Sequence, residues 1–168
     1  MPAAFWYLAV FAPMIPDIDV VGFKLGISYG NCFGHRGATH SIAFALLLSV
    51  AFVFLLRSAE ALKDTSSQYV AAAILFIAVA EHGFVDAMTD GGLGVAFFWP
   101  FSCKRYFFGF RPIHVSPLGA ARFASRFSAI AGSELRWLIV PCLAILALDS
   151  LFRFTQARRL SSDGTAAG

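Results

Sequence analysis

The stretch from residue 42 to residue 56, IAFALLLSVAFVFLL, carries no charge and a single hydroxyl group. With the residues that precede it, this apolar run begins near Thr39 and ends at Leu56. An uncharged run that approaches about 20 residues is typical of a helix that spans a lipid bilayer. The run therefore predicts a membrane protein.

Three further apolar runs repeat this pattern, at residues 2–15, 69–88 and 135–152. Pro16 ends the first run, and Pro141 should kink the last. Because only helices and closed barrels satisfy their backbone within lipid, we predict an all-α, multi-pass bundle of about four spans. Residues 1–153 are expected to form a single membrane-embedded domain, followed by a polar, disordered tail at 154–168.

An amphipathic helix is expected between the third and fourth runs. Ser116 and Pro117 have the pattern of an N-cap and first helical residue. In the following LGAARFASRFSAIAG, Phe123 and Phe127 share one side, while Arg122 and Arg126 share another. We expect this helix to lie at the membrane interface, and Gly132 or Ser133 to separate it from the last span.

The composition excludes a soluble domain. Of the 168 residues, 58% are hydrophobic, 14% are charged and 19 are phenylalanine, so the apolar excess must meet lipid. The net charge is +3, and the basic residues gather near the ends of apolar runs. This placement suits anionic headgroups, and no nucleic-acid partner is expected. The three cysteines form no even set, so no disulfide scaffold is predicted.

Six residues with side chains suited to metal binding lie at the edges of these apolar runs. They are Asp17, Asp19, His35, His40, His82 and Asp86. Ionisable groups near membrane depth are costly, and are retained where they face a cavity or one another. A mixture of imidazoles and carboxylates suits zinc, manganese or iron, so we predict one or two divalent ions, with zinc preferred.

The order of the six residues along the chain favours a single site. Two acids follow the first run, two histidines flank the start of the second, and a His–Asp pair lies near the end of the third. In a serpentine chain these three points face the same side of the membrane. We therefore expect all six side chains to meet beneath one headgroup layer.

The segment HRGATHS, residues 35–41, is the most specific motif. His35 and His40 are five residues apart, and the glycine between them lets both rings reach one point. Thr39 or Ser41 could cap the following helix or hydrogen-bond a ligand. Arg36 could hold an anionic group such as a phosphate. The alternative is an interfacial patch that touches headgroups.

The other two motifs are less specific. His82 and Asp86 are four residues apart and would share one face of a helix, where a simple hydrogen bond is the alternative to metal binding. In PDID, Pro16 should end a helix, and an extended turn would point Asp17 and Asp19 the same way. The alternative for PDID is a helix-ending turn with solvated aspartates.

The remaining polar residues have structural interpretations. Cys32 is expected to be an inert buried thiol and His114 a loop histidine, and interfacial anchoring is expected of Lys104, Arg105 and Arg111. Seven basic residues fall on the side of the six ligands and five on the other. By the positive-inside rule this favours a cytoplasmic site.

These motifs together resemble a known family. PDID, HRGATHS and HGFVDAMTDGG, followed by FFWPFSCKRYFFGFRPIHVSPLG, are similar to the YdjM-like family, bacterial inner-membrane proteins described as LexA-regulated, predicted metal-dependent hydrolases. The resemblance covers residues 13–137 and implies a helical membrane protein with a metal centre on the six residues. Members usually carry a further helical stretch with a histidine before PDID, so we expect one ligand to be absent or the start to be mis-assigned. A distant similarity to zinc-dependent phospholipase C and P1-nuclease-like enzymes suggests phosphoester chemistry.

Three functional hypotheses follow. The first is a membrane-embedded hydrolase in which a metal-activated water attacks an ester or phosphoester, with a lipid or lipid-linked substrate reached from the bilayer favoured. Asp19 or Asp86 would act as general base, and Arg36 would steady the developing anion. The second is a divalent metal or proton transporter, and the third is a non-catalytic membrane protein with a structural metal site.

Overall fold

A computed structural model of the protein describes residues 1–116 and 120–165. The described chain is helical, without strands. It forms two compact units, Met1–Arg111 and Pro112–Gly168. The all-α prediction is confirmed. Whether residues 1–153 act as one membrane-embedded domain stays a prediction.

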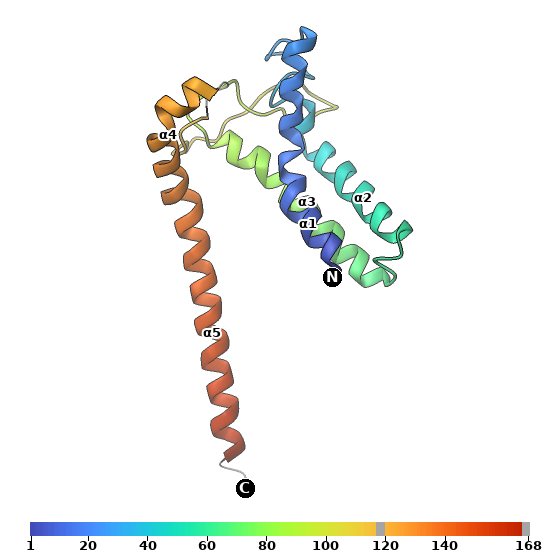
Figure 1. Ribbon diagram of the computed structural model, residues 1–168, viewed down its shortest axis with the longest axis vertical. Coiled ribbons are helices and arrows are strands. Elements are labelled where there is room, and N and C mark those ends of the chain that lie inside the picture. Colours follow the sequence, from blue (N-terminus) through green and yellow to red (C-terminus); the bar gives the residue numbers. More distant parts are fainter. Residues whose placement is uncertain (117–119, 166–168) are drawn as a thin grey trace. The chain divides into compact units, whose positions relative to one another are not determined.

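The decisive apolar run forms helix α2, Ile42–Ser58, which pairs with helix α3, Thr65–Ala87 (Figure 1). The hydroxyl of Ser41 accepts a hydrogen bond from the backbone N–H of Phe44 at 3.1 Å, so of the two residues expected as caps, Thr39 and Ser41, it is Ser41 that caps α2. The carboxylate of Asp64 caps α3 by accepting from the backbone N–H of Ser67 at 2.8 Å. Because a short turn joins the two paired helices, the start of α2 and the end of α3 lie at the same end of the pair.

Helix α1, Ala3–Phe11, packs against α3 and continues through two 3₁₀ segments, η1 (Ala12–Met14) and η2 (Pro16–Leu25). Phe5, Leu56 and Leu75 are buried together between α1, α2 and α3. Nearer the other end, Ala12, Ala45 and Val79 form a second small cluster, where the short side chains let the helices approach closely. The chain then continues into η2, which contacts the short 3₁₀ segment η3 (Ala38–His40) just before α2.

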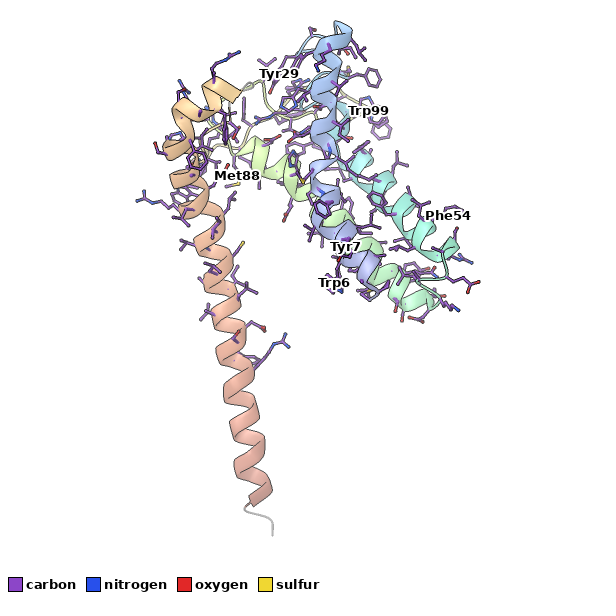
Figure 2. All side chains as sticks on the ribbon, viewed as in Figure 1. Trp6, Tyr7, Tyr29, Phe54, Met88 and Trp99 are labelled. Atoms are coloured by element: carbon purple, nitrogen blue, oxygen red, sulfur yellow. A yellow bond between two sulfur atoms is a disulfide. The ribbon has the colours of Figure 1, made fainter. Side chains whose placement is uncertain are left out.

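The outer surface of these helices is apolar. Trp6, Tyr7 and Phe54 project away from the helices that carry them (Figure 2), and their exposed fractions are 55%, 68% and 66%. Exposed aromatic and aliphatic surface of this extent is suited to contact with lipid.

Two helices are long and apolar enough to span a membrane, Thr65–Ala87 and a continuous stretch at Ala121–Ser150. A third span results if Ala3–Met14 and Pro16–Leu25, which are bent by 44° relative to each other, are counted together. Ile42–Ser58 is apolar but shorter. The structure thus supports two to three spans among the described residues, and the predicted fourth stays a prediction.

The second unit departs from the expected break. Helix α4 (Ala120–Glu134) continues through a π-helical turn, η4 (Leu135–Ile139), into α5 (Val140–Thr165), so Gly132 and Ser133 do not interrupt it. The ring of a helical proline clashes with the carbonyl four residues earlier, and the wider π turn directly before Pro141 makes room for it. Pro117, and with it the predicted cap, lies outside the described residues. The backbone is helical to Thr165, where a disordered tail was expected from residue 154.

Candidate metal centre

The PDID motif lies at the start of η2, just past the bend that follows α1. The predicted extended turn is wrong, because Ile15 has helical dihedral angles (φ −64°, ψ −39°) and Pro16 occupies the first position of a new 3₁₀ helix. Proline suits that position since its fixed φ is helical and its missing N–H would have had no partner. The closest contacts of Asp17 are with Nε2 of His40 and of His82, whereas those of Asp19 are with Nδ1 of His35 and of His40.

Four of the six predicted residues converge around one point. One ligand atom from each of Asp17, His40, His82 and Asp86 lies within 4.8 Å of all the others. Asp17 Oδ1 is 3.3 Å from Nε2 of His40 and 3.3 Å from Nε2 of His82. Asp86 Oδ2 is 3.3 Å from Nε2 of His40 and 3.8 Å from Nε2 of His82.

These contact atoms fit a divalent cation. Nε2 of His40, Nε2 of His82 and Oδ2 of Asp86 are buried and make no hydrogen bond within the described structure. Buried polar atoms are normally satisfied, so three of them facing one point indicate a missing partner. Ligands that lie 2.0–2.1 Å from a tetrahedral zinc ion are separated from one another by roughly 3.3 Å. The observed separations of 3.3–3.8 Å match this geometry.

Asp19 lies behind this cluster and supports it. Its Oδ2 is 3.2 Å from Nδ1 of His40 and accepts hydrogen bonds from the hydroxyl of Thr39 at 2.6 Å and the backbone N–H of Arg36 at 3.1 Å. Its Oδ1 is 2.7 Å from Nδ1 of His35. With both oxygens engaged and its side chain only 3% exposed, Asp19 orients the histidines from the rear.

Asp19, His35 and His40 also form a second group of atoms close enough to bind a cation. The 2.7 Å hydrogen bond between Asp19 and His35, and the contacts of His40 Nδ1 with Thr39 at 3.0 Å and Asp19 at 3.2 Å, however, already satisfy these atoms. A carboxylate that holds the far nitrogen of a metal-binding histidine is a common supporting arrangement. The geometry therefore separates the six predicted ligands into four that face a common point and two that lie behind it.

The carboxylates around the buried ring of His40 favour a positive charge at this position. Its side chain is fully buried, and burial alone lowers the pKa of an imidazole. The neighbouring carboxylates of Asp17, Asp19 and Asp86 outweigh the burial and raise the pKa of His40 to about 10. A proton is therefore held there at neutral pH in the absence of a cation, and a divalent cation satisfies the same demand.

Arg36 fixes the position of Asp86. Its Nη2 lies 2.7 Å from Oδ1 of Asp86, and its Nη1 donates to the hydroxyl of Thr89 at 2.9 Å and the carbonyl of Gly91 at 3.2 Å. The residue is buried and has a left-handed φ of 62°, which costs roughly 1–3 kcal/mol. These contacts favour a positioning role, and the predicted role in steadying an anion stays a prediction.

Close backbone packing brings α3 to the cluster. A Cβ atom at Gly83 would lie 2.8 Å from the carbonyl oxygen of His40, closer than side chains tolerate. The absence of a side chain at Gly83 therefore lets α3 approach the HRGATHS segment closely. Within that segment, a Cβ atom at Gly37 would overlap the carbonyl oxygen of Cys32.

Two residues that tie the surrounding loops together had different sequence interpretations. Arg105 donates to the carbonyl oxygens of Tyr29 at 2.7 Å and His35 at 2.8 Å, so it is more than the expected interfacial anchor. Cys32 forms a disulfide with Cys103, which corrects both the inert thiol and the absence of disulfides expected from an odd cysteine count. Nothing in the sequence distinguishes these two cysteines from Cys142, which is free and exposed.

The other predicted residues lie elsewhere. Lys104 lies over the ring of Tyr106 and Arg111 over that of Phe107, at 5.6 Å and 4.7 Å from the ring centroids. His114 belongs to the second unit, where its backbone N–H donates to Ser133 at 3.0 Å.

Comparison with known proteins finds relatives of this chain. A family described as YdjM inner membrane protein matches residues 2–159. Inner membrane protein YbcI of Escherichia coli (strain K12) is 32% identical over 155 residues, which cover 88% of this chain and 84% of that protein. No solved structure matches. The chain therefore belongs to the YdjM inner membrane protein family.

Proposed function

We propose that this protein is an inner-membrane, metal-dependent hydrolase with one divalent cation held by Asp17, His40, His82 and Asp86. The observation that supports it is the convergence of four ligand atoms within 4.8 Å, three of them buried without a hydrogen bond. Two imidazole nitrogens and two carboxylate oxygens are a donor set suited to zinc, and also to manganese or iron. With a fifth position left for water, such a cation would supply Lewis-acid activation of that water at neutral pH.

The protein's own groups prepare His40 for this role. The hydroxyl of Thr39 donates to Asp19, so its oxygen, 3.0 Å from Nδ1 of His40, is free to accept a hydrogen bond from that nitrogen. Asp19 accepts from the same nitrogen. Both contacts hold the ring proton on Nδ1, which leaves the lone pair of Nε2 directed at the cluster.

Access to the site is from the side of Asp17. Its side chain is 49% exposed, compared with 15% for Asp86 and 3% for Asp19. The sequence-based hypothesis placed the general base at Asp19 or Asp86. Asp17 fits this role better, because a base must reach both solvent and substrate; since Oδ1 of Asp17 faces the cation site, the proton would be taken by its other carboxylate oxygen.

The substrate class follows from the surroundings of the site. On η2, Ile18, Val21 and Leu25 expose 62%, 49% and 75% of their surface. Apolar surface next to a polar site at the end of a helical bundle favours an amphiphile whose head reaches the site while its tail stays in lipid. We therefore propose an ester or phosphoester of a lipid or lipid-linked molecule.

Metal analysis of the purified protein tests this proposal, with His40→Ala as the test variant and His114→Ala as the matched control in the other unit. We expect stoichiometric metal in the wild type and in His114→Ala, and loss of it in His40→Ala. Hydrolysis is then assayed with nitrophenyl phosphate mono- and diesters and with phospholipid vesicles. Wild-type protein without stoichiometric metal would overturn the proposal. Bound metal without any hydrolysis would favour the structural-site alternative instead.

A further inference from the structure

The disulfide between Cys32 and Cys103 lies at the same end of the Met1–Arg111 unit as the metal centre. The two cysteines are 71 residues apart in sequence, and their Cα atoms are separated by 5.3 Å, within the range that a disulfide requires. The carbonyl of Cys32 accepts a hydrogen bond from the backbone N–H of Ala38 at 2.8 Å. The bridge therefore holds the loop that continues directly into His35 and His40.

The compartment of a disulfide is informative in an inner-membrane protein. Membership of this family places the chain between the cytoplasm and the periplasm. Thiols are kept reduced in the cytoplasm, whereas the bacterial periplasm oxidises them. A disulfide outside the bilayer therefore reports which side its loop occupies.

We propose that Cys32 and Cys103 are an oxidation site for a periplasmic dithiol-oxidising protein, and that the metal centre consequently faces the periplasm. In this reaction one cysteine thiolate attacks the oxidant's disulfide and forms a mixed disulfide with it. The second cysteine thiolate then attacks the mixed disulfide, which forms the Cys32–Cys103 bond and releases the oxidant as a dithiol. The two cysteines lose two electrons and two protons, and the oxidant's disulfide is reduced to two thiols. Cys103 is exposed and Cys32 is half-buried, so the oxidant can reach the pair.

This orientation is opposite to the one favoured by the basic residues. The excess of seven over five on the site side includes Arg36 and Arg105. Both are used within the folded loops, Arg36 by Asp86 and Arg105 by four backbone carbonyls. Without these two the counts are equal, so charge gives no preference and the disulfide decides the side.

The oxidation state can be read directly in cells. Protein with Cys142→Ala is expressed in Escherichia coli, trapped with acid, and treated with a polyethylene-glycol maleimide before and after reduction. We expect no added mass before reduction and two additions after it. In a strain without the periplasmic thiol oxidase, two additions are expected from the start. Two free thiols in the oxidase-positive strain would overturn the proposal.

Orientation is tested independently with a matched pair of exposed lysines. In the Cys142→Ala background, Lys24→Cys places a thiol on the site side, and Lys63→Cys places one in the turn between α2 and α3. A membrane-impermeant maleimide added to spheroplasts should label Lys24→Cys, and should label Lys63→Cys only after permeabilisation. The reverse pattern would place the site in the cytoplasm and refute the proposal. Neither measurement depends on metal binding or hydrolysis.

Discussion

Asp19 and Asp17 contact opposite edges of the same imidazole, with Asp19 Oδ2 3.2 Å from Nδ1 of His40 and Asp17 Oδ1 3.3 Å from Nε2. One carboxylate thus faces the common point of the four ligand atoms, while the other holds the ring from the rear. The two residues are separated by one position in sequence, yet their substitution should have different effects on metal binding.

Asp19→Asn should weaken metal binding without abolishing it. The amide keeps the shape of the carboxylate but loses its charge and can present a donor to Nδ1 of His40. Loss of such a supporting carboxylate typically lowers metal affinity about 10–100-fold. Competition with a chelating dye measures the change. An affinity equal to that of the wild type would contradict the supporting role, and complete loss of metal would make Asp19 a direct ligand.

Metal affinity should rise with pH. The pKa of about 10 at His40 means that the metal-free site carries an additional proton at neutral pH. A cation must displace this proton, so the apparent affinity should increase about tenfold per pH unit below that pKa for each proton released. Dye competition at pH 6, 7 and 8 measures the slope, and proton release in weak buffer provides an independent check. An affinity that does not change with pH would show that His40 binds no cation.

Arg36→Lys should impair the site although the charge is retained. Lysine cannot reproduce the planar fork that joins Asp86 to Thr89 and Gly91. We expect a lower unfolding temperature and weaker metal binding, because Asp86 loses its orientation. Arg111→Lys is the control, since Arg111 is exposed and its guanidinium lies over the ring of Phe107. Equal behaviour of the two variants would contradict the positioning role of Arg36.

Gly83→Ala should separate α3 from the HRGATHS segment. The added Cβ would lie 2.8 Å from the carbonyl oxygen of His40, so the backbone must shift. Overpacking of this kind costs about 1–3 kcal/mol in the free energy of unfolding and should also reduce metal binding through His82. Gly132→Ala in α4 has open space around its Cβ and should gain up to about 1 kcal/mol of helix propensity. Unfolding in detergent micelles compares the two.

Much of the fold could be predicted from local sequence. Apolar runs without charge identify helices α2 and α3, and the serpentine order predicts that the PDID, HRGATHS and His82–Asp86 segments lie close together. The continuity of α4 and α5 was not predicted, because an isolated glycine is tolerated inside a helix at a cost of about 1 kcal/mol and is therefore no certain sign of a helix end.

The sequence predicted that the six side chains lie close together, but not which of them face the common point and which lie behind it. Asp17 and Asp19 are the same residue type in one tetrapeptide, and only the 3₁₀ geometry of η2 reveals that one faces the cluster and the other supports it. The roles of Cys103 and Arg105 depend on contacts made across 70 residues or more. Three cysteines permit three pairings, and composition cannot choose among them.

Because η2 is a 3₁₀ helix, the number of residues between the two acids determines the direction in which each carboxylate points. With three residues per turn, each position advances by about 120° around the axis. Acids two positions apart therefore point in different directions and contact the two nitrogens of the His40 ring. Adding a single residue between them would align both with the same edge of the imidazole and leave the other edge bare. The number of residues between the two acids is therefore as important for the site as the presence of their carboxylates.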